Sequence, residues 1–414
     1  MTARPALTSH SIRRGSAAAL CLAVVFASAA SSLHAAEPGT ASTSAAGSAP
    51  QRHVPPHVDH QPIDRVPADL RPGPVIHVQP AMVSAEAAAV LQRALYAAHA
   101  AVGSYGVTFA AVRDGSLIWA GASGVERDGR TVLTPDRPLV IGSVMKTFVS
   151  ALVLQLVQEG RLALDQPVAT LLPDAPASVG AVTVRQLLGH SSGLADVYND
   201  TTKAMLEMTP DRSLSPIEIL ATLPEPWFAP GQSWTYSNTN YLVLGLVAER
   251  VLGRSLGDAI ETRLAAPLGL PSAHTLDPAD AGSPLRPAWA SVFYGSGAMA
   301  ASAADVAAWG DELYGGTLLS PEMRALMLQF NEHDTGLGVQ RIEVGTHKGY
   351  GHSGLMSTYT SLLVYLPEAD LTLAVLVNLA HADINGMLTF APAGGTSLLD
   401  LTLRAATTAT SATP

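Results

Sequence analysis

Two pairs of strand-like segments at opposite ends of the chain constrain the fold more than any other sequence feature. YGVTFAAV and SLIWAGA flank the turn sequence RDG, and much later LLVYLPEAD is followed by LTLAVLVNL. Apolar segments of this length joined by a short turn are typical of β-hairpins. Helical and loop-rich sequence separates the two pairs. We therefore predict an α/β fold of the α+β type, in which an antiparallel sheet closed by both ends of the chain is flanked by helices and accompanied by a helical subdomain.

The helices expected within this frame begin and end at recognisable caps. SAEAAAVLQRALYAAHA, which starts at Ser84, has helical spacing of its apolar residues, and SVMKTFVSALVLQLVQEG reads as a long apolar helix that ends at Gly160. Thr183 and Ser302 stand where N-caps of further helices are expected.

The first residues of the chain have the pattern of an export signal. Arg13 and Arg14 precede an apolar run, and Leu33-His34-Ala35 suits a signal peptidase. Because the run is shorter than the ~20 residues of a membrane-spanning helix, we expect export to the periplasm or beyond, with no stable membrane span. The expected organisation is a signal peptide at 1–35, a linker rich in Pro, Ser, Ala and His at 36–83, a folded domain at 84–400 and a disordered tail at 401–414.

Charge and residue usage exclude several classes of function. A formal net charge of -10 without a cluster of lysines or arginines argues against a nucleic-acid partner. Cys21 is the single cysteine and lies inside the signal peptide, so the mature protein lacks a thiol nucleophile. His53, His57 and His60 have the spacing of metal ligands, but prolines break any helix that would align them. We predict a solvated linker there, and neither a metal nor a cofactor.

GHSSGL at 189–194 contains Gly-x-Ser-x-Gly, the pattern of a nucleophile elbow, with Ser191 at its centre. Such an elbow requires a buried strand before the serine and a helix after it. The preceding VTVRQLL favours a short helix, and the residues after GHSSGL are loop-like. We therefore interpret this segment as a loop that packs near a site.

Ser143 and Lys146 form a second serine motif, Ser-x-x-Lys, at the start of the long apolar helix. Three residues make just under one helical turn, so the hydroxyl and the ammonium share a face. A serine hydroxyl is a weak nucleophile until a neighbouring base takes its proton. Lys146 can act as that base if burial lowers its pKa.

Two further motifs follow in order. Tyr236-Ser237-Asn238 lies in a Pro-Gly turn before an apolar helix, and His352-Ser353-Gly354 leads into a strand. Taken singly, each has a structural interpretation, such as ring packing for Tyr236 or helix capping for Asn238. Trp227 and Trp234 flank the tyrosine motif, and core packing is the interpretation we favour for both.

With these three motifs in order, the sequence resembles the penicillin-recognising serine hydrolases, which include class C β-lactamases, DD-carboxypeptidases and carboxylesterases of the same frame. The resemblance runs from about Ser84 to Leu379. It includes the connecting segments GRLALDQPVATLLPD, VRQLLGHSSGL and GSGAMAASAADVAAWG.

The resemblance implies a role for each motif residue. Ser143 would be the acylated nucleophile, Lys146 its base, and Tyr236 a proton shuttle whose phenol pKa is lowered by Lys146. Asn238 would hold the substrate amide and orient Lys146. The substrate-binding strand would comprise His352, Ser353, Gly354 and Leu355, and the backbone N–H groups of Ser143 and Leu355 would form an oxyanion hole.

The resemblance leaves the substrate open among D-alanyl peptides, esters and β-lactams. His352 stands where β-lactamases of this type carry lysine, and a protonated histidine can offer charge to a substrate carboxylate. We therefore expect D-alanyl-D-alanine carboxypeptidase chemistry first, with a carboxylesterase or a class C-like β-lactamase as alternatives. A penicillin-binding module without turnover is the alternative that is not an enzyme.

Overall fold

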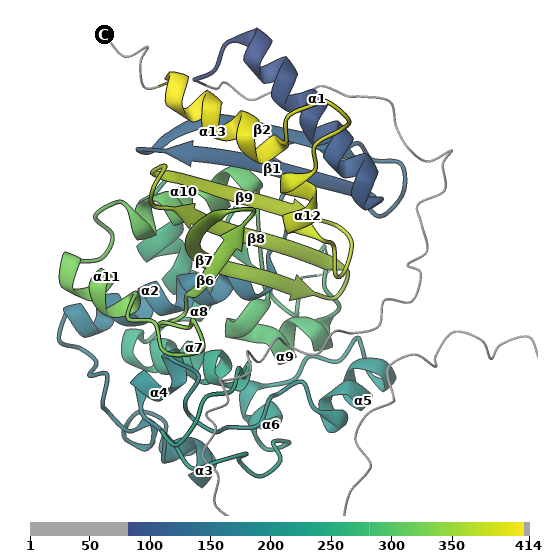
Figure 1. Ribbon diagram of the computed structural model, residues 1–414. Coiled ribbons are helices and arrows are strands. Elements are labelled where there is room, and N and C mark those ends of the chain that lie inside the picture. The colour runs from purple at the N-terminus through teal and green to yellow at the C-terminus, as the bar shows by residue number, and fades with distance from the viewer. Residues whose placement is uncertain (1–81, 281, 410–414) are drawn as a thin grey trace, which may run out of the picture. The chain divides into compact units, whose positions relative to one another are not determined.

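The two hairpins from opposite ends of the chain meet in one sheet (Figure 1). The structure is a computed structural model that describes residues 82–280 and 282–409. Strand β1 (Gly106–Arg113) pairs antiparallel with β9 (Leu371–Val377), in a register that runs from Val107 opposite Val377 to Val112 opposite Thr372. The predicted closure of the sheet by both ends of the chain is confirmed.

The main sheet has six antiparallel strands in the order β2-β1-β9-β8-β7-β6. Its other strands are β2 (Ser116–Gly124), β6 (Gln340–Val344), β7 (His347–Met356) and β8 (Tyr359–Leu366). A small second sheet consists of β3 (Leu139–Val140), β5 (Met299–Ala301) and β4 (His274–Thr275), in that order.

Successive side chains of the central strands enter two separate cores. Phe109 and Val375 belong to the core under the terminal helices, whereas their neighbours Ala110 and Leu376 belong to the larger core on the opposite face. This alternation follows from the two-residue period of a strand. Every residue of β9 is buried because helices cover both faces of the sheet.

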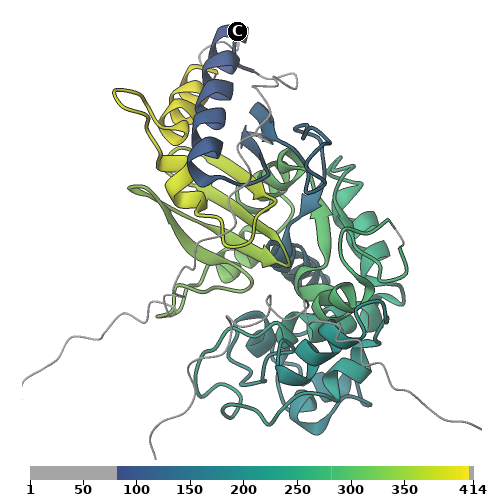
Figure 2. The ribbon, with the colours of Figure 1, turned by 90° about the vertical axis from the view of Figure 1, so that its right-hand side faces the viewer.

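The terminal helices cover one face of the sheet, and Figures 1 and 2 both show α1 and α13 side by side there. These helices are α1 (Ala85–Val102), α12 (Ile384–Thr389) and α13 (Leu398–Ala409). The other face is covered by α10 (Ala303–Tyr314), which packs on β1, β8 and β9. The predicted caps are present, since Ser84, Thr183 and Ser302 each accept a hydrogen bond from the first turn of their helix.

The remaining helices build the predicted helical subdomain and its connection to the sheet. They are α2 (Met145–Gln158), α3 (Ala177–Gly180), α4 (Val184–Leu188), α5 (Asp200–Met208), α6 (Pro216–Leu220), α7 (Thr239–Leu252), α8 (Leu256–Ile260), α9 (Pro287–Gly297) and α11 (Pro321–Met327), with short turns η2 (Gly142–Val144), η3 (Val168–Thr170) and η4 (Glu261–Ala265). Within the described part of the chain, no helix is both long enough and apolar enough to cross a bilayer.

The tail prediction is wrong for residues 401–409. They continue α13, whose residues Leu398, Leu399, Ala405 and Ala406 are buried against α1 and β2. The Thr/Ala-rich composition hid an apolar helix face that only gains stability by packing on a partner helix. The predicted signal peptide, most of the predicted linker, and His53, His57 and His60 lie outside the described residues.

We expect Leu398→Ala to lower the free energy of unfolding by about 2–5 kcal/mol, because Leu398 is fully buried and its truncation leaves a cavity. Denaturant unfolding followed by circular dichroism measures the change. Arg404→Ala, on the exposed face of the same helix, is the control and should change stability by no more than about 0.5 kcal/mol. Equal effects of the two substitutions would show that α13 does not pack on the domain.

Candidate active site

Ser143 lies in the turn η2 at the buried start of α2. Helix α2 is apolar on almost every side because it runs through the larger core between the sheet and the helical subdomain. The polar residues at its first turn are therefore placed inside the protein. Ser143 and Lys146 meet there, with the Lys146 Nζ donating to the Ser143 Oγ at 2.9 Å.

Two glycines allow the turn around Ser143 to approach strand β7 closely. Gly142 has a φ of +50°, and a Cβ on it would lie 3.1 Å from the backbone nitrogen of Leu355. A Cβ on Gly354 would lie 2.1 Å from the carbonyl oxygen of Ile141. The backbone around Ser143 and the backbone of Leu355 are adjacent because neither glycine carries a side chain.

Strand β7 has one unpaired edge next to the Ser143 turn. Its pairing with β6 ends where Gln340 faces Gly351, while its pairing with β8 continues to Met356. From His352 onward β7 pairs with β8 alone, and the turn before Ser143 lies over the face of these two strands, where the Ser361 hydroxyl donates to the Ile141 carbonyl. A polypeptide edge in this position can pair with a substrate backbone.

Lys146 is fully buried and uses all three of its donors. Besides the Ser143 Oγ, its Nζ donates to the Asn238 Oδ1 at 2.8 Å and to the Ser296 carbonyl at 2.6 Å. Burial lowers the pKa of Lys146 from 10.5 to about 7, and the charge of Asp196 opposes that shift. A substantial fraction of the amine is therefore neutral near pH 7.

Tyr236 donates its phenol proton to the Ser143 Oγ at 2.8 Å, so the serine oxygen accepts from both neighbours. The expectation that Lys146 lowers the phenol pKa is wrong. Burial raises the pKa of Tyr236 well above its ordinary value of 10, an effect that the hydrogen bond to Ser143 only partly offsets. Tyr236 is therefore a proton donor at neutral pH.

Asp196, which we did not predict, fixes the orientation of Asn238. Its carboxylate accepts hydrogen bonds from the Asn238 backbone N–H at 3.0 Å and from the Asn238 Nδ2 at 3.1 Å. The side-chain amide must then present its oxygen to Lys146. Asp196 lies two residues after GHSSGL, but nothing in that position distinguishes it from an ordinary loop aspartate.

Ser296 was also missed, since its contact with Lys146 is made by a main-chain carbonyl. Helix α9 is kinked at Tyr294, just before Ser296. Any residue type supplies the same carbonyl oxygen, so no sequence pattern marks this contact.

His352 is placed at the site, but not with the charge we expected. Its ring lies 6.2 Å from that of Tyr236, and its Nδ1 donates to the Ser353 carbonyl at 2.6 Å. Burial and the nearby Lys146 lower the pKa of His352 to about 3. The imidazole is therefore neutral, and the expected charge for a substrate carboxylate is absent from this side chain. Ser353 and Leu355 are exposed on the same strand, whereas Gly354 is buried.

Ser191 does not have the surroundings of a nucleophile elbow. The helix α4, not a strand, precedes it, and the residues after it run as a loop toward Asn199. Its neighbour His190, by contrast, lies with its ring against Tyr236. The interpretation of GHSSGL as a loop near the site agrees with this arrangement.

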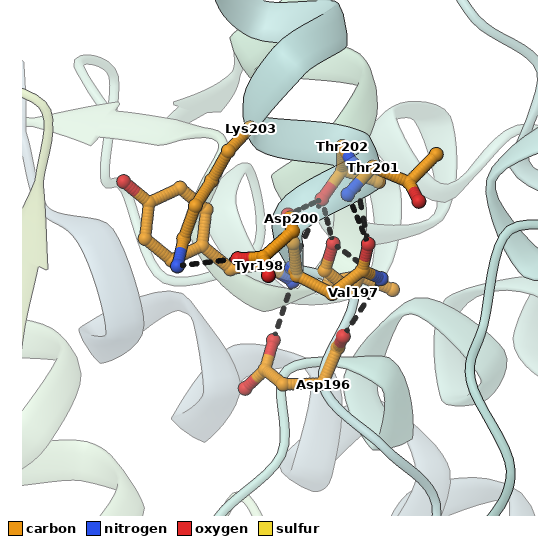
Figure 3. Close-up of polar contacts among 8 residues, drawn as sticks. Asp196, Val197, Tyr198, Asp200, Thr201, Thr202 and Lys203 are labelled. Carbon is orange, nitrogen blue, oxygen red and sulfur yellow. Dashed lines mark hydrogen bonds and ion pairs between the residues drawn. The ribbon is translucent and has the colours of Figure 1, made fainter. Parts of the chain in front are cut away.

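A cavity of about 270 Å³ lies beside Asp196, and the segment that forms it is drawn in Figure 3. Asp196 accepts from the Tyr198 backbone N–H, and Lys203 pairs with Asp200 and lies over the Tyr198 ring. Trp227 lines this cavity and is 53% exposed, so core packing was the wrong interpretation for it. Trp234 stacks on His333.

The described residues contain no group of three or more His, Cys, Asp or Glu side chains that could hold a metal ion.

We expect Asp196→Asn to lower the pKa of Lys146 below about 7. The negative charge of Asp196 raises this pKa and partly offsets the lowering caused by burial, so its removal leaves burial unopposed. The chain has only three lysines, at 146, 203 and 348, so ¹³Cε-lysine NMR resolves the titration directly. Lys203→Arg and Lys348→Arg assign the signals.

The matched control for this titration is Asp200→Asn, which removes a nearby exposed carboxylate that pairs with Lys203. It should leave the pKa of Lys146 unchanged. An unchanged or raised pKa in Asp196→Asn would contradict the electrostatic role assigned to Asp196.

Several proteins of known activity resemble parts of this chain. Penicillin-binding protein 4 of Amycolatopsis lactamdurans is 34% identical over 177 residues, which are 41% of this chain and 45% of the relative. Esterase EstB of Burkholderia gladioli is 34% identical over 173 residues, 38% of this chain and 44% of the relative. A D-aminopeptidase of Brucella ovis is 30% identical over 175 residues, 41% of this chain and 33% of the relative. The matches thus span less than half the length of these curated relatives.

Solved structures match over a larger share of the chain. A D-stereospecific amidohydrolase from Streptomyces sp. superposes with a TM-score of 0.62 at 29% identity, covering 73% of this chain and 97% of that protein. A D-amino acid amidase from Ochrobactrum anthropi, complexed with L-phenylalanine, has a TM-score of 0.63 at 23% identity and shares the fold, over 78% of this chain and 99% of that protein. A model of the Beta-lactamase family matches residues 91–389, a span that begins in α1 and ends with α12. With most of its length covered by that match, the chain belongs to the Beta-lactamase family and is a serine hydrolase of the penicillin-recognising fold.

Proposed function

We propose that this protein hydrolyses amide and ester bonds of D-amino acid derivatives, D-alanyl peptides included, through an acyl-enzyme on Ser143. The observation that carries the proposal is the double hydrogen bond to the Ser143 Oγ, at 2.9 Å from the Lys146 Nζ and 2.8 Å from the Tyr236 Oη. One partner can take a proton near neutral pH and the other can give one. That pairing is what nucleophilic attack followed by departure of an amine requires.

In the acylation step the Ser143 Oγ attacks the substrate carbonyl carbon and its proton passes to the neutral Lys146 amine. The carbonyl oxygen becomes an oxyanion, for which the backbone N–H groups of Ser143 and Leu355 are the proposed donors. Such donors are typically worth about 3 kcal/mol each in the barrier. As the carbon–nitrogen bond breaks, the leaving amine takes a proton from the Tyr236 phenol, and the proton held by Lys146 replaces it.

Water completes the cycle by attacking the acyl-enzyme. Its proton is taken by the same base, the acid product leaves, and Ser143 regains its proton. Asn238 is the proposed contact for the amide of the substrate, because Asp196 already fixes its side chain. The exposed edge of β7 is the proposed binding site for the backbone of the substrate.

The choice of D-amino acid derivatives rests on two kinds of support. Relatives with matching sequence include a D-aminopeptidase and a D-stereospecific amidohydrolase. The carboxypeptidase function that we expected first depends on a charge for the terminal carboxylate, which neutral His352 does not supply. We therefore place amide and aminopeptidase substrates before carboxypeptidase substrates, and β-lactams after both.

A carboxylesterase is the second candidate function. Leu355, 44% exposed beside the Ser143 turn, offers an apolar contact for an acyl group. The relative EstB is an esterase by name. A binding module without turnover is disfavoured because the serine, lysine and tyrosine are all present and hydrogen-bonded to one another.

Export remains a proposal that rests on the sequence of the first 35 residues alone. A periplasmic or secreted location would give the enzyme access to D-alanyl peptides. Fractionation of expressing cells, with the mass of the mature N-terminus, tests it.

We expect Ser143→Ala to lower hydrolysis of D-phenylalanine p-nitroanilide at least 10³-fold, because it removes the proposed nucleophile. Ser191→Ala should retain the activity of the unmodified protein, since Ser191 lies outside the hydrogen-bonded group. Measurement of the intact mass after incubation with benzylpenicillin detects any acyl adduct, and peptide mapping then identifies the residue that carries it.

The opposite pattern, with activity lost in Ser191→Ala and kept in Ser143→Ala, would overturn the proposed nucleophile. Hydrolysis of p-nitrophenyl acetate with no turnover of either enantiomer of the anilide would favour the esterase. A persistent penicillin adduct without turnover of any of these substrates would favour the binding module.

The rate should depend on pH through Lys146. The neutral amine is the active form, so kcat/KM should rise about tenfold per pH unit below about 7 and level off above it. His352 remains neutral across the range from pH 5 to 9, because its pKa is lowered to about 3.

The measurement is kcat/KM for the anilide from pH 5 to 9 at constant ionic strength. Lys348→Arg, an exposed lysine on β7, should leave the profile unchanged. A rate that is flat or falls with rising pH over this range would exclude Lys146 as the base.

A further inference from the structure

His190 contacts three consecutive residues of the tyrosine motif. Its carbonyl oxygen accepts the Thr235 backbone N–H at 3.0 Å, and its Nδ1 accepts the Ser237 backbone N–H at 3.2 Å. Between these two bonds its ring stacks on Tyr236, with ring centroids 4.4 Å apart and planes 25° apart. The backbone on both sides of Tyr236 and the Tyr236 ring itself are thus held by one residue.

The histidine ring is fixed in turn by its own loop. Its Nδ1 also accepts from the Asn240 Nδ2 at 3.0 Å, and the Asn240 Oδ1 accepts from the Ser192 hydroxyl at 2.6 Å. Ser192 and His190 are therefore both hydrogen-bonded to α7 through the side chain of Asn240. The backbone of His190 is left-handed, with a φ of +58°, which turns the chain out of α4 and carries the ring toward Tyr236.

We propose that His190 is a positioning residue that holds the Tyr236 phenol against the Ser143 Oγ. The inference rests on the proposed function, in which that phenol protonates the leaving amine. The phenol must stay 2.8 Å from the serine oxygen while the substrate is bound, and a displacement of about 1 Å can cost a factor of ~10² in rate. GHSSGL then serves catalysis through its histidine rather than through Ser191.

The protonation state of the ring is consistent with this role. Nδ1 accepts two N–H groups, so the imidazole carries its proton on Nε2. Its pKa is held well below the ordinary value by burial and by the nearby charge of Lys146, while Tyr236 and Tyr241 pack against the ring. A proton on Nδ1 would face two donors, so the stacked arrangement requires the neutral ring.

A double-mutant cycle between His190→Asn and Tyr236→Phe tests the proposal. Asparagine tolerates the left-handed backbone but has no ring to stack, and phenylalanine keeps the ring of Tyr236 while removing its phenol. With the phenol present, His190→Asn should lower kcat for D-phenylalanine p-nitroanilide about 10- to 100-fold. In the Tyr236→Phe background the same change should cost less than about 3-fold.

The leaving group provides a second readout. p-Nitrophenolate departs without a proton, whereas an aniline needs one, so His190→Asn should affect p-nitrophenyl acetate much less than the anilide. His99 is the matched control: it is a buried histidine of α1 that is hydrogen-bonded to the Ser123 hydroxyl in β2 and to the Ser104 carbonyl. His99→Asn should lower both rates equally or not at all, whatever it does to thermal stability.

Equal losses for the His190 variant in the two backgrounds, or for the two substrates, would overturn the positioning role and leave a structural one. If His190→Asn does not fold by circular dichroism, His190→Gly replaces it, since glycine adopts the left-handed backbone without strain and also lacks a stacking ring. Activity that survives Ser143→Ala would overturn the proposed function as well. An additive cycle with an inactive Ser143→Ala variant would overturn only the inference about His190.

Discussion

The burial of Lys146 is the constraint on which the rest of the site depends. Its amine lies at the start of an apolar helix, out of contact with solvent, and transfer of a charged ammonium to such a place costs several kcal/mol. The difference between a pKa of 10.5 and one of about 7 corresponds to roughly 5 kcal/mol in favour of the neutral form. Three acceptors keep the amine in place, namely a hydroxyl, an amide oxygen and a carbonyl oxygen. All three are uncharged, which is why the amine stays near the midpoint of its titration.

The surrounding titratable groups are consistent with a site that holds at most one positive charge. His190 and His352 both have lowered pKa values, and Lys146 contributes to the shift of each. Asp196 is the carboxylate that acts in the opposite direction, and it reaches Lys146 through Asn238 rather than by direct contact. Tyr236 is kept protonated by burial. The proton positions that acyl transfer needs therefore follow from burial more than from pairing of charges.

The architecture brings these groups together from distant parts of the chain. The sheet is closed by β1 and β9, and the Ser143 turn packs on β7, whose outer edge is unpaired beyond Gly351. Gly142 and Gly354 make the close approach of these two backbones sterically allowed. The loop from 189 to 196 approaches from the helical subdomain and supplies His190 and Asp196, which hold Tyr236 and Asn238. The tyrosine motif is thus supported by a loop whose own serine, Ser191, lies outside the hydrogen-bonded group at the site.

Local patterns in the sequence determined the hairpins, the helix caps and the face shared by Ser143 and Lys146. Strand alternation, capping and helical spacing act over a few residues, so they can be read without knowledge of the fold. The order of the three motifs was equally visible and predicted the family. Tertiary structure alone decided the charge of His352, the direction of the Tyr236 pKa shift and the packing of α13, because burial depends on segments that are distant in sequence. The tertiary structure also decided the contacts of Asp196, His190 and Ser296. A hydrogen bond between segments some 40 to 150 residues apart produces no periodic pattern in the sequence of either segment.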